Sequence, residues 1–79
     1  MDNELLIRMK LLNKIFNETY KCNCWFSFNE DNINIKVESY NAYFNWLFQI
    51  NENNFVIDYI IGKFEKEALD YCFERKDYN

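Results

Sequence analysis

The stretch CNCWFSFNEDNINIKVE, residues 22–38, decides the fold of this chain. Every second residue on either side of a polar tetrapeptide is apolar, and the two series are Cys24, Phe26, Phe28 and Ile33, Ile35, Val37. A period of two places alternate side chains on opposite faces of a strand, so the stretch predicts two strands. Asn and Asp tolerate left-handed backbone angles, and residues 29–32 are therefore expected to form the turn of a β-hairpin without glycine.

A similar pattern recurs further along the chain. Trp46, Phe48 and Ile50 precede the polar residues 51–54, and Phe55, Ile57 and Tyr59 follow them. This pattern predicts a second hairpin, and the two hairpins together predict a four-stranded antiparallel sheet. Residues 40–48 also match a helical stripe that begins after Ser39, which is the alternative to a strand over residues 43–50. Tyr, Phe, Trp and Ile favour the strand.

Both flanks of the sheet segment have the 3.6-residue period of amphipathic helices. The first helix is expected over residues 3–19, with an apolar stripe of Leu5, Met9, Leu12 and Phe16 that is widened by Leu11 and Ile15. The second is expected from Lys63 to about Lys76, with Phe64, Ala68 and Cys72 on one face, widened by Leu69 and Phe73.

Gly62 is the single glycine, and we expect it at the turn between the last strand and the second helix. A chain of 79 residues is long enough for one domain. The predicted fold is therefore a single α+β domain over residues 1–79. It consists of an N-terminal helix, a four-stranded antiparallel sheet made of two hairpins, and a C-terminal helix, with both helices on one sheet face.

The composition excludes most catalytic designs. The chain has no His, which removes the imidazole base, the Ser-His and Cys-His nucleophile pairs and the histidine metal ligand. One glycine cannot form a dinucleotide fingerprint or a phosphate loop. We therefore expect no enzymatic activity, no catalytic residue and no cofactor.

The three cysteines are expected to be structural. Cys22 and Cys24 would lie on the same face of a strand, and only Cys72 could join them as a metal ligand, which leaves a zinc site incomplete. Cys24 and Cys72 lie on apolar stripes, where cysteine serves as a small core residue. The start Met1-Asp2-Asn3-Glu4 is unlike a secretory signal, and no stretch approaches about 18 apolar residues, so we expect a cytoplasmic protein without a membrane span.

The net charge of −4 is concentrated in the sheet segment. Residues 22–62 hold five acidic residues against Lys36 alone: Glu30, Asp31, Glu38, Glu52 and Asp58. Trp25, Tyr40 and Tyr43 are the aromatic residues expected beside them on the surface. Acidic groups around exposed aromatics suit a basic protein patch, because charge steers the encounter and aromatics anchor it. Direct binding of nucleic acid would need more interleaved Lys and Arg.

In size, acidity, aromatic content and AT-rich residue bias, the whole chain resembles the small proteins that phages and mobile elements use to disable host defences, including anti-CRISPR and DNA-mimicking inhibitors. The resemblance implies stoichiometric binding to a basic, nucleic-acid-handling protein such as a nuclease. It also implies that the five acidic residues above make electrostatic contacts and the three aromatics act as anchors. The alternative is a structural or regulatory subunit that self-associates through an edge strand or an aromatic face; a monomer or a homodimer is compatible with the sequence.

Overall fold

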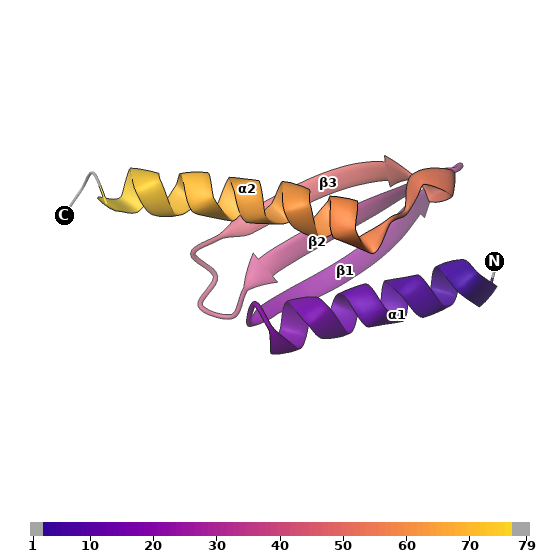
Figure 1. Cartoon of the computed structure of the whole chain (residues 1–79), viewed down its shortest axis with the longest axis horizontal. Coiled ribbons are helices and arrows are strands. Elements are labelled where there is room, and N and C mark those ends of the chain that lie inside the picture. Colours follow the sequence, from indigo (N-terminus) through magenta and orange to yellow (C-terminus); the bar gives the residue numbers. More distant parts are fainter. Residues whose placement is uncertain (1–2, 77–79) are drawn as a thin grey trace.

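The computed structural model describes the backbone of residues 3–76 and the side chains of residues 3–71 (Figure 1). In chain order the elements are α1 (Asn3–Glu18), β1 (Cys22–Asn29), β2 (Asn32–Ser39), β3 (Asn45–Asn51), the short 3₁₀ helix η1 (Glu52–Asn54) and α2 (Ile57–Lys76). The strands form an antiparallel sheet in the order β1-β2-β3, and both helices lie against the same face of it (Figure 1). The fold is α+β, as expected, but the sheet has three strands among the described residues.

The hairpin of residues 22–38 is confirmed. β1 pairs with β2 in a register that places Phe26 opposite Ile35 and Phe28 opposite Ile33. Its turn lacks glycine, and the residue that adopts the left-handed region is Glu30, with φ 57°. Asn and Asp were the expected carriers of this conformation. The prediction of a left-handed residue in this turn is therefore confirmed, but the residue that adopts the conformation is Glu30.

The predicted fourth strand is wrong. The Asn51 side chain accepts a hydrogen bond from the Asn53 backbone N–H at 2.9 Å, which caps η1 and turns the chain away from the sheet. α2 then begins at Ile57, six residues earlier than expected. Gly62 lies inside this helix with no positive φ, so the expected turn at Gly62 is wrong as well.

Burial confirms the helical period in this segment. Phe55, Ile60 and Phe64 are buried, whereas Tyr59 is half exposed. Alternation in a strand would have buried Ile57 and Tyr59 together with Phe55. Over a run of five residues that contains Phe, Val, Ile and Tyr, the strand period of two and the helix period of 3.6 both fit. The sequence pattern therefore predicted a strand where the chain forms a helix.

The second hairpin is formed by β2 and β3. These strands pair through Ile35 opposite Phe48 and Ile33 opposite Ile50, and residues 40–44 connect them. The strand preference over the helical alternative is confirmed for residues 45–50, while Tyr43 and Phe44 belong to the connecting loop.

The core lies between the sheet and the two helices. α1 buries all four residues of the predicted stripe: Leu5, Met9, Leu12 and Phe16. Phe16 and Phe64 meet edge to face at 4.9 Å between ring centroids, and Trp46 of β3 lies 5.5 Å from Phe64. Leu11 and Leu69, which were expected to widen the stripes, are exposed. The side chains of Cys72 and Phe73 lie outside the described residues.

Two groups near this core are held in their neutral forms. Burial raises the pKa of the Cys24 thiol to about 12, and the neighbouring Cys22 adds to the effect. Partial burial and a 2.7 Å hydrogen bond donated to Glu65 raise the pKa of Tyr20 to about 12. Cys22 is buried and its Sγ–H donates to the Tyr20 carbonyl. Cys22 and Cys24 thus behave as apolar core residues, as the sequence predicts for Cys24.

These shifts predict a loss of stability at alkaline pH. The ordinary pKa values of Cys24 and Tyr20 are 9.0 and 10.0, so ionisation favours the unfolded chain as the pH rises from about 9 toward 12. The urea midpoint should be constant up to about pH 8 and lower at about pH 11. The double variant Cys24→Ala/Tyr20→Phe should lose less over the same interval. An identical pH dependence in the double variant would assign the effect to other groups.

Candidate protein-binding surface

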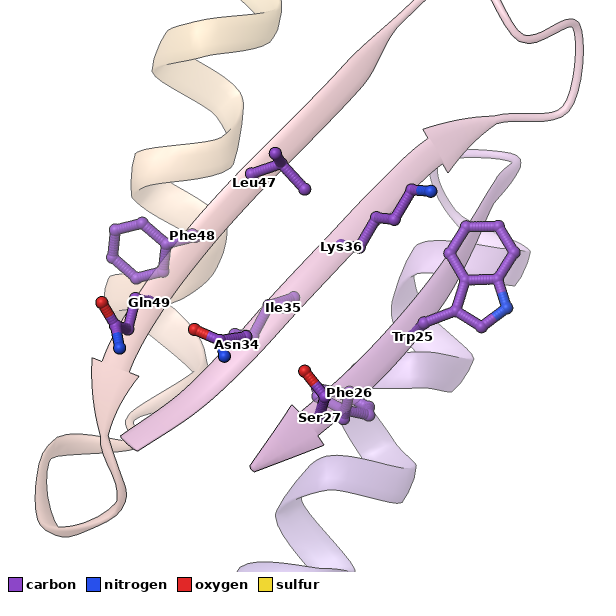
Figure 2. A pocket seen from close by; sticks show the side chains of 9 residues that line it. All are labelled: Trp25, Phe26, Ser27, Asn34, Ile35, Lys36, Leu47, Phe48 and Gln49. Atoms are coloured by element: carbon purple, nitrogen blue, oxygen red, sulfur yellow. The ribbon is translucent and has the colours of Figure 1, made fainter. Parts of the chain in front are cut away.

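One face of the sheet carries no helix and is available for binding. The pairing register sets Trp25, Lys36 and Leu47 in one row across the three strands, and Ser27, Asn34 and Gln49 in the next. We call these six residues the open face. Together with Phe26, Ile35 and Phe48, they line a shallow groove of about 470 Å³ (Figure 2).

The middle of the open face is apolar with a single cation. The side chain of Trp25 is 47% exposed and that of Leu47 is 74% exposed. The Lys36 ammonium lies over the Trp25 ring, 5.4 Å from its centroid, in a cation–π contact. Exposed large side chains on a rigid sheet lose little entropy when they are covered, and aromatic residues of this kind are the usual anchors of protein interfaces.

Acidic side chains gather at one end of the sheet. Glu30 and Asp31 form the β1–β2 turn, and Glu52 lies beside them because its backbone N–H donates to the Asp31 carbonyl at 2.9 Å. We call these three residues the acidic end; they lie at the right of Figure 1. Asn29, Asn32 and Asn51 form the last row of the sheet and connect the acidic end to the open face.

Both helices begin at this same end, and each contributes a carboxylate in its first turn (Figure 1). Glu4 opens α1 and lies 4.0 Å from Arg8, and Asp58 opens α2. A negative charge in the first turn is favourable to the helix dipole. Glu4 and Asp58 therefore stabilise the first turns of their helices, in addition to adding negative charge at this end of the molecule.

The eight residues singled out in the sequence do not form one surface. Trp25 lies on the open face, and Glu30, Asp31 and Glu52 come together at the acidic end. Asp58 lies near that end. Glu38 is half-buried and pairs with Asn23 and Asn45, in the row next to Lys36; it therefore lies on the same sheet face as Trp25, at the end away from the acidic residues.

Tyr40 and Tyr43 belong to the β2–β3 loop at the opposite end from the acidic residues (Figure 1). The Tyr40 hydroxyl donates to the Asn17 carbonyl and side-chain oxygens at 3.2 and 3.0 Å. This contact ties the loop to the last turn of α1, which gives Tyr40 a structural role.

Leu47 is the residue of the open face that sequence reasoning passed over. It lies between Trp46 and Phe48, which face the core, and period two alone would have placed it on the opposite face. Leu47 could therefore have been identified from the sequence as an apolar residue at a strand position that faces solvent.

No protein-family model matches the chain, and no curated protein or solved structure matches it either. Within the part of the chain that the structure describes, no helix is both long and apolar enough to cross a membrane. The same residues contain no group of three or more Cys, Asp or Glu side chains that could hold a metal ion.

Proposed function

We propose that this chain is a non-catalytic inhibitor that binds a basic, nucleic-acid-handling site on another protein, such as a nuclease of a host defence system. The observation that carries the proposal is the convergence of Glu30, Asp31 and Glu52 at the acidic end, next to an uncovered sheet face. These residues come from two separate segments, whose backbones are joined by the hydrogen bond from the Glu52 N–H to the Asp31 carbonyl. Because the two segments are already joined, their backbones need little reorganisation when a cationic surface approaches.

The two surfaces have different parts in the proposed mechanism. The acidic end attracts the basic site and sets the orientation of the encounter, which raises the association rate at low salt. Trp25 and Leu47 on the open face then exclude water and slow dissociation. A bound inhibitor covers the site and prevents nucleic acid from entering. A phage-encoded inhibitor that acts in the host cytoplasm would have this design.

The charge of the acidic end can be tested with a variant that keeps its shape. We expect Glu30→Gln/Asp31→Asn/Glu52→Gln to weaken binding to the basic partner by at least about tenfold, because three steering carboxylates are lost. The measurement is twofold: retention of host proteins on the immobilised chain at about 50 and 500 mM salt, and release of nucleic acid from the retained protein by the free chain.

A matched control separates the local effect from net charge. Leu11→Lys/Glu18→Lys on the outer face of α1 changes the net charge by the same three units, at exposed positions. This variant should bind and inhibit like the parent chain. Equal binding by the triple amide variant and the parent would contradict the proposal, and so would a retained protein whose nucleic-acid binding is unaffected.

A second candidate, self-association, is favoured by the exposure of Leu47 and by the edge strands β1 and β3. Two copies that paired through open faces or edge strands would cover apolar surface, so salt would affect them little. Sedimentation at micromolar concentration tests this candidate. A dimer that persists at 500 mM salt and is lost in Leu47→Asp would favour self-association over binding of a basic partner.

A further inference from the structure

The outer edge of β3 lies beside a groove that the open face does not include. β3 is the last strand in the order β1-β2-β3, and α2 runs behind it (Figure 2). The groove has a volume of about 690 Å³ and lies where the second half of β3 meets the start of α2. It is lined by residues 48–51 of β3, by Asn53 and Asn54 of η1, and by Val56 and Tyr59. We call this site the edge groove.

The backbone of β3 presents hydrogen-bonding groups at this edge. The Phe44 carbonyl, just before β3, accepts from β2, and the Glu52 N–H, just after β3, donates to the β1–β2 turn, both at 2.9 Å. Bonds to the same neighbour recur at every second residue of an antiparallel strand, so the even-numbered residues of β3 bond to β2. The N–H and C=O groups of Leu47 and Gln49 therefore point away from β2, and no hydrogen bond of the described residues uses them.

β3 has none of the sequence features that protect sheet edges. Its sequence, NWLFQIN, contains no charged residue and no Pro. Its register with β2 contains no bulge, because the partner pairs from Asn45 to Asn51 follow one another without a skip. Free edges of natural sheets usually carry a charge, a Pro or a bulge that prevents further pairing. The edge of β3 is therefore suited to pair with another strand.

Apolar side chains border this edge on both faces of the sheet. Leu47 is exposed on the open face. On the face that the helices cover, Val56 and Tyr59 are both more than half exposed, and the Tyr59 ring lies 6.4 Å from that of Phe48 and 5.4 Å from the Lys63 ammonium. A strand added beside β3 points alternate side chains to the two faces. One set would cover Leu47, and the other would cover Val56 and Tyr59.

We propose that the edge groove binds an extended segment of a partner protein as a fourth strand, antiparallel to β3. The segment pairs with the backbone of Leu47 and Gln49, and its alternate apolar side chains fill the groove. All pairs in this sheet are antiparallel, and antiparallel pairing is the more stable arrangement. The proposal goes beyond the function proposed above, because it concerns backbone pairing at a different surface and requires no nucleic-acid-handling partner.

The charge around the groove defines the segment further. β3 ends beside the acidic end, so an antiparallel segment enters with its N-terminal residues next to Glu30, Asp31 and Glu52. Lys or Arg at those positions complements the carboxylates. A second copy of this chain does not supply that charge through its own β3, because residues 39–51 contain no Lys or Arg. The segment is therefore basic at its N-terminal end, followed by alternating apolar residues.

A synthetic peptide tests the site directly. The probe is acetyl-Lys-Lys-Val-Thr-Val-Thr-Val-amide, titrated into the isotope-labelled full chain and followed by amide NMR spectra. We expect shifts centred on Leu47, Gln49 and Tyr59, slower hydrogen exchange of the Leu47 and Gln49 amides, and a dissociation constant in the millimolar range. Shifts centred on β1 instead would overturn the proposal.

Methylated peptides test the backbone pairing. When the Val side chains fill the groove, the two Thr N–H groups point to β3 and the Val N–H groups point away from it. Methylation of both Thr nitrogens should weaken binding at least about tenfold, because it removes the donors without changing any side chain. The matched control carries the two methyl groups on the last two Val nitrogens and should bind like the unmodified peptide. Equal binding of the two methylated peptides would overturn the proposal.

A peptide with its charge at the other end tests the direction. Acetyl-Val-Thr-Val-Thr-Val-Lys-Lys-amide has the same composition and should bind at least about threefold more weakly, because its Lys residues lie away from the acidic end. The variant Glu30→Gln/Asp31→Asn/Glu52→Gln should bind the two peptides equally. Equal binding of both peptides by the parent chain would overturn the antiparallel assignment.

Variants of the chain assign the binding to the groove. Tyr59→Ala should weaken binding of the probe by about fivefold, because it removes apolar surface from the lining. Leu69→Ala truncates an exposed residue of the same helix outside the groove and should bind like the parent chain. Unchanged binding in Tyr59→Ala would overturn the proposal. Slow exchange of the Leu47 and Gln49 amides in the free chain that is lost on dilution would show that a second copy covers the edge, and would overturn the partner assignment.

Discussion

Phe16→Ala is expected to lower the free energy of unfolding by about 3–5 kcal/mol. The Phe16 side chain has no exposed surface, and its ring lies 4.9 Å from that of Phe64 and 6.4 Å from that of Trp46. It thus joins α1 to α2 and β3. A domain of 79 residues has a total stability of about 4–12 kcal/mol, so the loss removes a large part of it.

Urea unfolding followed by tryptophan fluorescence and circular dichroism measures this loss. Leu11→Ala is the control on the same helix, because its side chain is 48% exposed and its truncation should cost about 1 kcal/mol or less. Similar losses in the two variants would mean that the core does not centre on Phe16.

Ile60→Ala is expected to cost about 2–5 kcal/mol, and Tyr59→Ala about 1 kcal/mol or less. Ile60 has no exposed surface, whereas Tyr59 is 52% exposed, with its ring 6.4 Å from that of Phe48. The pair distinguishes a helix from the strand that the sequence pattern suggests. A strand would bury Tyr59 and expose Ile60, and the two losses would then be reversed.

Residues 22–38 contain enough local information to predict their structure. Alternation defines both strands, and a polar tetrapeptide of the right length joins them. The stripe of α1 was predictable for the same reason, because four apolar residues recur at helical spacing over a long segment.

Residues 51–59 do not contain that information. Both the strand pattern and the helix pattern fit these few residues. The polar sequence that begins at Asn51, whose side chain caps η1, also resembles a hairpin turn. Only the burial of Ile60 and Phe64 in the core separates the two structures. Here tertiary packing decides the secondary structure.

The binding surfaces were predictable only in part. Excess acidity in the sheet segment is visible in the sequence, but the contact between Asp31 and Glu52 depends on where β3 ends beside the first hairpin. The ring contact between Phe44 of the β2–β3 loop and Tyr71 of α2, 5.1 Å between centroids, depends on that loop meeting α2, so it could not be read from local spacing.

The strand order β1-β2-β3 has a consequence for how quickly the protein forms. Each strand pairs with its neighbour along the chain, so the sheet closes through two hairpins without any long crossover. Chains dominated by such local pairing fold rapidly, and hairpins close within about 1–10 μs. The β1–β2 hairpin, with Glu30 and Asp31 in its turn, can therefore begin to form while α2 is still being synthesised. For the stoichiometric binding proposed above, this order of assembly would make each new copy competent soon after synthesis.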